Sequence, residues 1–325
     1  MTGSGIRTGF AALILFFLVF PFFQVGSEAL SQEKRDAVYR KVFDLDLPYG
    51  QGPGTLGLQD RLDQPPRGPE SFSSDAEGNL YLCDTVNRKI STWSPRRRFF
   101  TEILLPTDIT PNDIVLDSRG RLYIFDDHNG KLHQIDKSGG VLKTIAVDPT
   151  RRWSRGPVHI VGDLIYMACG DQEDLLIGKI ETGMLKELAA ADPSARPGRG
   201  IHGASGRRYF LHLIRGKGAT VEIVQPSGVL VQSLELAQPK LLTIQFLGED
   251  QKENFYLQTE SLENEALILE VQKFNARGDY LTSIRIPENN YQLWSVKLLA
   301  VDERGTVHQF LPTREKGKLR SFGSE

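Results

Sequence analysis

Short runs of alternating apolar and polar residues recur along the chain, separated by turns rich in Asp, Gly and Asn. One copy starts near Gly68 and passes through residues 75–81 (DAEGNLY); another starts near Thr110 and passes through 117–123 (DSRGRLY). The two copies are offset by 42 residues throughout. Alternation of this kind is typical of half-buried β-strands, and a fixed offset of this length is typical of repeat architectures.

The aromatic residue that ends this motif follows the same repeat along the chain. It recurs at Tyr81, Tyr123, Tyr166, Tyr209 and Tyr256, and a last copy places His308 in the sixth position. A period in the forties, with several strands and turns in each copy, is what a four-stranded propeller blade requires. We therefore expect an all-β fold, a six-bladed β-propeller.

Each copy can be divided into strands and turns. In the first copy, residues 71–75 predict the inner strand, 76–79 a tight turn, 80–83 the second strand and 89–93 the third. Asp84 and Asn87 lie between the last two strands. We interpret such Asp and Asn residues as turn builders that bond nearby backbone groups, although the same residue types also serve as ligands.

A propeller must close its ring, because an open end would expose sheet edges. The sixth copy supplies only three strands, at 296–302, 305–311 and 318–322. Residues 39–47, with apolar side chains at Val42, Leu45 and Leu47, can supply the fourth from the N-terminal side. The Gly- and Pro-rich segment 48–69 is then predicted as a linker into the first blade.

These patterns predict the domain organisation. Residues 1–27 form a signal peptide or an N-terminal anchor, and 28–66 carry the ring-closing strand and the linker. The propeller blades follow at about 67–106, 107–148, 149–192, 193–236, 237–288 and 289–325.

The N-terminus predicts export. Arg7 precedes an uninterrupted apolar stretch, Phe10 to Phe23, whose 14 residues suit a signal-peptide core and are short for a membrane span. Small residues follow at Gly26, Ser27 and Ala29. The alternative is an uncleaved anchor, and both interpretations place the remaining chain outside the cytoplasm, in the periplasm or the extracellular space. The two cysteines, Cys83 and Cys169, fall in non-neighbouring blades, so we expect buried free thiols.

Composition and charge narrow the choice of partner. The 325 residues include 40% hydrophobic residues, enough for a packed core, and the formal charge of −2 comes without long runs of one sign. Nucleic acid is not an expected partner, since its recognition requires a clustered basic face. We expect the protein to associate with a membrane only through an uncleaved N-terminal segment, if at all.

The first copy also resembles a known family. The Gly-Pro-x-x-Phe start, the Asp-x-x-Gly-Asn-Leu-Tyr motif and the Asp-x-x-Asn-Arg-x-Ile ending between Gly68 and Ile90 resemble NHL repeats, with a good likeness in the second copy and a partial one in the sixth. NHL-type propellers are mostly binding platforms, so the resemblance implies a binding role.

A second, local resemblance concerns residues 111–122, which look like a segment of the gluconolactonase-type propellers. Those enzymes hold one divalent metal at the channel mouth with a Glu, an Asn and an Asp. Asn112 matches their motif, but Arg67 stands where they place a Glu just before Gly-Pro.

Equivalent positions at the starts of the inner strands should form a ring around the central channel. The repeat alignment places Glu70, Asn112 and Lys297 at that position, with His202 and His159 near it in two other blades. Glu70, Asn112 and His202 are candidate ligands of a single divalent cation, Ca²⁺, Mg²⁺ or Zn²⁺. The alternative is a polar, water-filled channel mouth without a cofactor, and Lys297 on the same ring would repel a cation.

A second ring consists of Arg67, Arg155 and Arg199, each placed immediately before an inner strand. Three guanidinium groups on one face would favour a carboxylate, sulfate or phosphate-bearing ligand. The alternative is that each Arg pairs with an Asp or Glu of a neighbouring blade.

The sequence contains no nucleophile motif, so no catalytic residue is assigned. Our leading hypothesis is an exported, non-catalytic binding or scaffold propeller that engages an anionic small molecule, a glycan or a partner protein at its channel face. The alternatives are a divalent-metal-dependent, lactonase-like hydrolase and a structural interaction protein of an envelope complex.

Overall fold

The alternating segments form six antiparallel sheets in a computed structural model of the chain, which describes residues 39–94, 99–147, 156–169, 173–181, 200–287 and 289–324. The sheets are arranged as the blades of a β-propeller, and no described residue is helical. The predicted six-bladed all-β fold is therefore confirmed. The described residues accordingly contain no helix of the length and hydropathy needed to cross a membrane.

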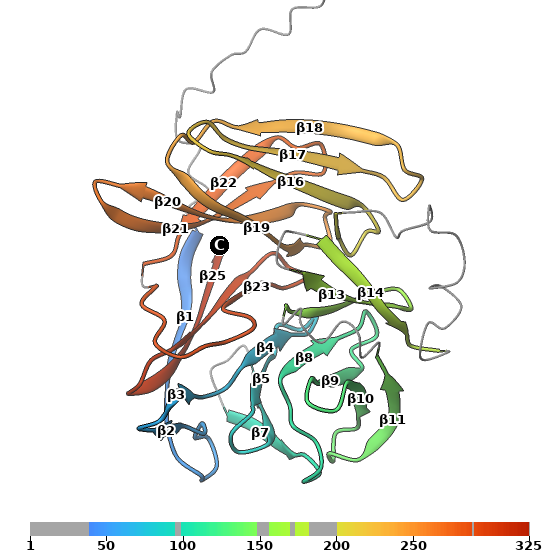
Figure 1. Ribbon diagram of the computed structural model, residues 1–325, viewed down its shortest axis with the longest axis vertical. Helices are drawn as coiled ribbons and strands as arrows, with labels where there is room; N and C mark the ends of the chain where they lie inside the picture. Colours follow the sequence, from blue (N-terminus) through green and yellow to red (C-terminus); the bar gives the residue numbers. More distant parts are fainter. Residues whose placement is uncertain are drawn as a thin grey trace, which may run out of the picture. The chain divides into compact units, whose positions relative to one another are not determined.

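Blades one to three follow one another along the chain (Figure 1). Blade one consists of β4 (Ser71–Ser74), β5 (Leu80–Asp84), β6 (Lys89–Trp93) and β7 (Phe99–Leu104). Blade two consists of β8 (Asp113–Leu116), β9 (Leu122–Asp126), β10 (Lys131–Ile135) and β11 (Val141–Ala146). The described strands of blade three are β12 (Val158–Val161), β13 (Leu164–Cys169) and β14 (Glu173–Lys179).

Blades four to six complete the set. Blade four consists of β15 (Ile201–His202), β16 (Arg208–Ile214), β17 (Gly218–Val224) and β18 (Leu230–Leu236). Blade five consists of β19 (Leu241–Glu249), β20 (Phe255–Glu263), β21 (Ala266–Phe274) and β22 (Tyr280–Arg285). Blade six consists of β23 (Leu299–Val301), β24 (Val307–Pro312), β25 (Lys316–Ser324) and β1 (Tyr39–Pro48).

The ring is closed by the N-terminal strand, as predicted. β1 pairs antiparallel with β25, so the blue and red ends of the described chain lie side by side in Figure 1. The apolar side chains of this strand do not all lie on one face. The register shifts between Lys41 and Phe43, which leaves Val42 43% exposed and buries Phe43 and Leu47. A bulge turns the residues that follow it to the other face of the strand.

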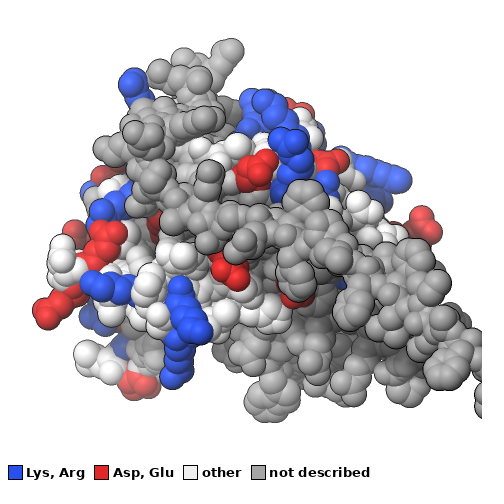
Figure 2. Space-filling view, turned by 90° about the horizontal axis from the view of Figure 1, so that it is seen from above, with Lys and Arg blue, Asp and Glu red and all other residues white. Residues whose placement is uncertain are grey.

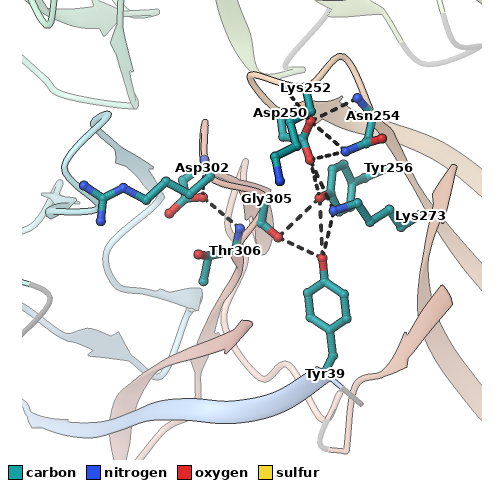
Figure 3. A network of polar contacts seen from close by, with 10 residues as sticks. Tyr39, Asp250, Lys252, Asn254, Tyr256, Lys273, Asp302, Gly305 and Thr306 are labelled. Atoms are coloured by element: carbon teal, nitrogen blue, oxygen red, sulfur yellow. Dashed lines mark hydrogen bonds and ion pairs between the residues drawn. The ribbon is translucent and has the colours of Figure 1, made fainter. Parts of the chain in front are cut away.

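Tyr39, the first described residue of β1, ties this strand to blades five and six (Figure 3). Its hydroxyl donates to the Gly305 carbonyl oxygen at 3.1 Å and accepts from Lys273 Nζ at 3.4 Å. Lys273 in turn pairs with Asp250 at 3.2 Å, and Asp250 accepts from the buried Tyr256 hydroxyl at 2.9 Å. The closing strand is thus held by side-chain contacts in addition to its backbone ladder.

The segment predicted as a linker contains secondary structure of its own. It forms a hairpin of β2 (Gln59–Arg61) and β3 (Gln64–Arg67), and Leu56 just before the hairpin is fully buried between blades six and one. A Gly- and Pro-rich composition marks turns but does not exclude a short hairpin between them.

Among the described residues, five apolar cores are shared between neighbouring blades: one and two, two and three, four and five, five and six, and six and one. In the last of these, for example, Phe72 of blade one lies 6.4 Å from Phe310 of blade six, ring centre to ring centre. Burying an aromatic side chain of this size contributes roughly 1.5–3 kcal/mol. Each blade is therefore stabilised by its neighbours and not by a core of its own.

The turn between the first two strands of a blade repeats one hydrogen-bond pattern. Asp250 accepts from the backbone N–H groups two and four residues later and from the Tyr256 hydroxyl six residues later. Asp302 makes the same backbone contacts and pairs with His308 Nε2 at 3.2 Å. The contact with Asp302 confirms His308 as the sixth member of the aromatic series. The interpretation of Asp84 and Asn87 as turn builders is confirmed by their own contacts, since Asp84 accepts from the Asn87 N–H at 3.1 Å and from the Asn87 side-chain nitrogen at 3.0 Å.

Cys83 is a free thiol and fully buried, as expected. Burial, followed by the negative charges of Asp113 and Glu70, raises its pKa well above the ordinary value. The thiol therefore stays protonated and behaves as a small apolar side chain.

Candidate functional site

Glu70 and Asn112 lie at equivalent positions of adjacent blades and contact each other. The strand register fixes this equivalence. Tyr81 pairs with Ser73, which follows Glu70 by three residues, and Tyr123 pairs with Val115, which follows Asn112 by three residues. Asn112 Nδ2 donates to Glu70 Oε2 at 2.9 Å. Two of the predicted site residues are thus brought together by the repeat.

Arg67 occupies the other oxygen of the same carboxylate. Its Nε donates to Glu70 Oε1 at 3.1 Å, and its second guanidinium nitrogen donates to the same atom. The Glu70 side chain is 4% exposed, whereas that of Arg67 is 47% exposed. A buried carboxylate thereby fixes a half-exposed guanidinium in place, because a paired guanidinium gives up part of its rotational freedom.

The pairing of Glu70 limits what it can do as a ligand. Both of its oxygens accept hydrogen bonds, and the Asn112 amide oxygen accepts from the Asp127 N–H at 3.1 Å. A cation bound by Glu70 and Asn112 would have to displace these donors. Among the described residues, no group of three His, Cys, Asp or Glu side chains is placed to hold a metal ion.

Lys297, the third residue at the same repeat position, reaches from blade six to blade two. Its Nζ lies 2.8 Å from Asp113 Oδ1 and donates to the Ile114 carbonyl oxygen at 2.7 Å. Asp113 also accepts from the Ser71 hydroxyl of blade one and, at 2.6 Å, from the Val158 N–H of blade three. One buried carboxylate therefore connects blades one, two, three and six. Sequence reasoning placed Lys297 on the ring but did not identify Asp113 as its partner.

His202 is not brought to Glu70 and Asn112. Tyr209 of blade four corresponds to Tyr81 of blade one. Tyr209 pairs with Ile201, and His202 follows Ile201 by one residue. Tyr81 pairs with Ser73, and Glu70 precedes Ser73 by three residues. Four residues of extended strand span about 13 Å. His202 therefore belongs to a different level of the inner strands than Glu70 and Asn112.

Instead, His202 joins His159 around one carboxylate. His159 Nε2 lies 2.9 Å and His202 Nδ1 3.2 Å from Asp174 Oδ2, which also accepts from the His202 backbone N–H. The Tyr166 ring stacks between the two imidazoles, with ring centres 5.6 Å from His159 and 4.2 Å from His202. This polar cluster links blades three and four, whereas the five apolar cores link the other neighbours.

Asp174 is fully buried, and its Oδ1 has no hydrogen-bond partner. Burial by itself would raise the pKa of Asp174, but His159 and His202 outweigh burial and lower it below the ordinary value of 3.8. The carboxylate is therefore ionised at neutral pH, and both imidazoles are oriented as donors to it.

Replacing Asp174 with Asn should destabilise the protein at neutral pH by about 1–3 kcal/mol, because the neutral amide binds the two imidazoles less well than a carboxylate does. A depressed pKa contributes stability that is present above the ordinary pKa and is lost as the pH falls through the folded-state value. The difference between parent and D174N should thus be greatest above about pH 4 and shrink below it. Urea unfolding between pH 7 and pH 3 measures this difference, with the exposed Asp279→Asn as control. A constant difference across that range would contradict the assignment.

Arg155 and Arg199, the other two members of the predicted arginine ring, lie outside the described residues. The structure therefore places only Arg67 of that ring.

Arg67 also lines a hollow that the sequence did not indicate. The hollow has a volume of about 480 Å³ and lies between the β2–β3 hairpin, the turn between β5 and β6 of blade one and the loop that enters blade two. Its lining includes Arg61, Arg67, Arg88, Thr85 and Thr110, together with Asp60. Three guanidinium groups thus face one space.

The comparisons with known proteins establish the fold. No protein-family model matches the chain, and no curated protein matches it either. Among solved structures, a member of the DUF4221 family from Bacteroides vulgatus is 12% identical, with a TM-score of 0.53, and the match covers 88% of this chain and 97% of that one. A virginiamycin B lyase from Staphylococcus aureus is also 12% identical, with a TM-score of 0.40, over 82% of this chain and 98% of that one. At 12% identity, the likeness to the DUF4221 structure concerns the propeller fold alone.

Proposed function

We propose that this protein is an exported binding or scaffold propeller that engages an anionic ligand at the channel face carrying Arg67. The ligand is a small molecule, a glycan or an acidic segment of a partner protein. The observation that carries the proposal is the fixed guanidinium of Arg67, which the buried Glu70 holds while 47% of the Arg67 side chain stays exposed. A charged donor that is already oriented loses little freedom when a ligand binds.

The pairing of the remaining channel groups supports a binding role over a catalytic one. Lys297 and Asp113 satisfy each other, and both Glu70 oxygens are taken by Arg67 and Asn112. None of these groups is left as an accessible base or nucleophile next to a second reactive group. The resemblance of the first copy to NHL repeats, whose propellers are mostly binding platforms, points the same way.

The proposed partners exclude nucleic acid. On the face shown in Figure 2, the described Lys and Arg side chains are interspersed with Asp and Glu and form no continuous basic stripe. The near-neutral formal charge of −2 supports the same exclusion. Export rests on the apolar stretch Phe10 to Phe23 and Arg7 before it.

Substitution of the three ring arginines tests the proposal. In R67Q/R155Q/R199Q the glutamine at position 67 can still donate to Glu70, while the positive charge is lost. The parent should be stabilised in a thermal-shift screen by at least one ligand bearing carboxylate, sulfate or phosphate groups, and the triple variant should lose that shift. The matched control R119A/R277A/R285A removes three exposed arginines elsewhere and should keep it. Equal shifts in the parent and the Arg67 triple variant would refute the proposal.

A further inference from the structure

The hollow beside Arg67 has the composition of an oxyanion site. Arg61 comes from β2, Arg67 from β3, and Arg88 from the turn between β5 and β6. Against these three positive charges the lining contains one negative charge, that of Asp60, while Glu70 lies beneath and already binds Arg67. The space between the three guanidinium groups therefore carries net positive charge.

Two of these guanidinium groups are held in place by neighbouring oxygens. With the Gln59 amide oriented so that its oxygen faces Arg61, that oxygen accepts from Arg61 Nε at 2.9 Å and from a terminal guanidinium nitrogen at 2.8 Å. Arg88 donates from a terminal nitrogen to the Thr107 carbonyl oxygen at 3.0 Å. Each guanidinium has five N–H donors, so these contacts orient Arg61 and Arg88 and leave further donors for a ligand.

The backbone of Arg88 is in an unfavourable conformation. Its φ is 50°, in the left-handed region, whereas the same turn in blade two has Gly130 there with a φ of 62°. The two turns correspond residue by residue, because Asn87 bonds Asp84 as Asn129 bonds Asp126. A long side chain at a position that suits glycine costs stability. This strain is the kind that accompanies a functional role of the side chain.

Thr85 supplies an independent sign of a missing partner. Thr85 is 6% exposed and lines the hollow, and its Oγ1 is buried with no hydrogen-bond partner. Buried hydroxyls are nearly always bonded, because an unsatisfied one loses its hydrogen bond to water without replacement. Because Thr85 lines the hollow, a ligand oxygen bound there is the acceptor that we assign to this hydroxyl.

We propose that this hollow binds a tetrahedral oxyanion, the phosphate or sulfate monoester group of a larger polar ligand, through Arg61, Arg67, Arg88 and the Thr85 hydroxyl. A tetrahedral group offers terminal oxygens in several directions, which suits donors that come from three separate segments better than a planar carboxylate does. The volume of about 480 Å³ lies within the range of small-molecule pockets and exceeds what an inorganic anion fills. This inference rests on the proposed function and names the chemistry of its ligand.

Titration calorimetry with inorganic phosphate, sulfate and acetate, at constant ionic strength, tests the inference on the full chain. The parent should bind phosphate and sulfate and prefer both to acetate. R61A and R88G should each weaken phosphate or sulfate binding by about tenfold or more, since a charge-assisted hydrogen bond is lost in each. R88G should fold at least as stably as the parent, because it introduces the residue that blade two has at this position. The control R277A removes an exposed arginine of blade five and should bind as the parent does.

Thr85→Val gives a readout that charge alone would not change. The substitution removes the unpaired hydroxyl at nearly constant shape, so the melting temperature without anion should rise or stay the same, while the shift produced by phosphate should shrink. Preference for phosphate over sulfate, or the reverse, would identify the source of the ligand group.

The variants also separate this inference from the proposed function. If the parent binds an anion and R67Q/R155Q/R199Q does not, but R61A, R88G and T85V bind normally, the assignment of the hollow as the binding site is wrong and the proposed function stands. If the parent binds none of the three anions, this inference fails. The proposed function fails only if the thermal-shift screen also finds no anionic ligand whose shift is lost in R67Q/R155Q/R199Q.

Discussion

Replacing Lys297 with methionine should lower the free energy of unfolding by about 3–5 kcal/mol, because the variant leaves the Asp113 carboxylate buried without its counter-ion. The Lys297 and Asp113 side chains are 15% and 2% exposed, so solvent screens their interaction little. Asp113 also binds Ser71 and the Val158 N–H, and the loss should therefore affect the junctions of four blades. Urea or thermal unfolding of the purified variant measures the effect.

Two further variants separate this effect from a general loss of charge. Lys41→Met breaks an exposed pair with Asp44 and should cost less than about 1 kcal/mol. K297M/D113N removes both charges, so its cost should be smaller than the sum of the two single substitutions. A K297M variant as stable as the parent would show that the channel pair contributes nothing to the ring.

The fold could be predicted from the sequence because its signal is local and repeated. In blades one, five and six the turn Asp contacts the aromatic residue six positions later within one hairpin, as Asp75 and Tyr81 do at 2.9 Å. The repeated motif shows where the first two strands of each blade lie in the sequence. Glu70 and Asn112 stand at the same distance from their motifs, so they lie next to each other in neighbouring blades. The repeat therefore predicted both the blades and the shared position of Glu70 and Asn112 on the inner strands.

The rest of the site depends on contacts with no local signal. Asp113 of blade two and Lys297 of blade six meet from positions far apart in the chain, and Asp174 reaches both His159 and His202 from the third strand of its blade. Thr85 carries no motif that distinguishes a paired hydroxyl from an unpaired one. The departure of Arg88 from the glycine of blade two is visible in the sequence, but only the backbone angle shows what it means.

In blade four the turn Asp of the repeat is missing, and a residue of the neighbouring blade replaces it. Six residues before Tyr209, where four other blades have Asp, the chain has Gly203. Glu249, at the end of β19 in blade five, supplies the carboxylate instead: it accepts from the Ser205 N–H at 2.7 Å, from the Ser205 hydroxyl at 2.8 Å and from the Tyr209 hydroxyl. A Cβ atom at Gly203 would lie 2.5 Å from Glu249 Cδ, so the two positions compete for one space.

Because a side chain at position 203 and Glu249 would occupy the same space, we expect that substituting both positions restores stability lost in the single variants. Glu249→Ala should destabilise the protein by about 2–4 kcal/mol, because it leaves the fully buried Tyr209 hydroxyl and the Ser205 donors without an acceptor. Gly203→Asp alone should also destabilise, through the clash and through repulsion between two carboxylates. The double variant G203D/E249A restores one carboxylate in the position that Asp75 and Asp250 occupy in their own blades, and should be more stable than either single variant.

Chemical unfolding of the three variants and the parent gives the coupling energy directly. Glu263→Ala is the control, since Glu263 lies in the same blade, its ion pair with Arg285 is exposed on both sides, and its loss should cost less than about 1 kcal/mol. Additive costs in the double variant would mean that Glu249 does not replace the turn Asp. A restored stability would show that one blade completes the turn of its neighbour, and that these two blades are coupled by a polar contact in addition to the apolar core around Tyr209 and Phe255.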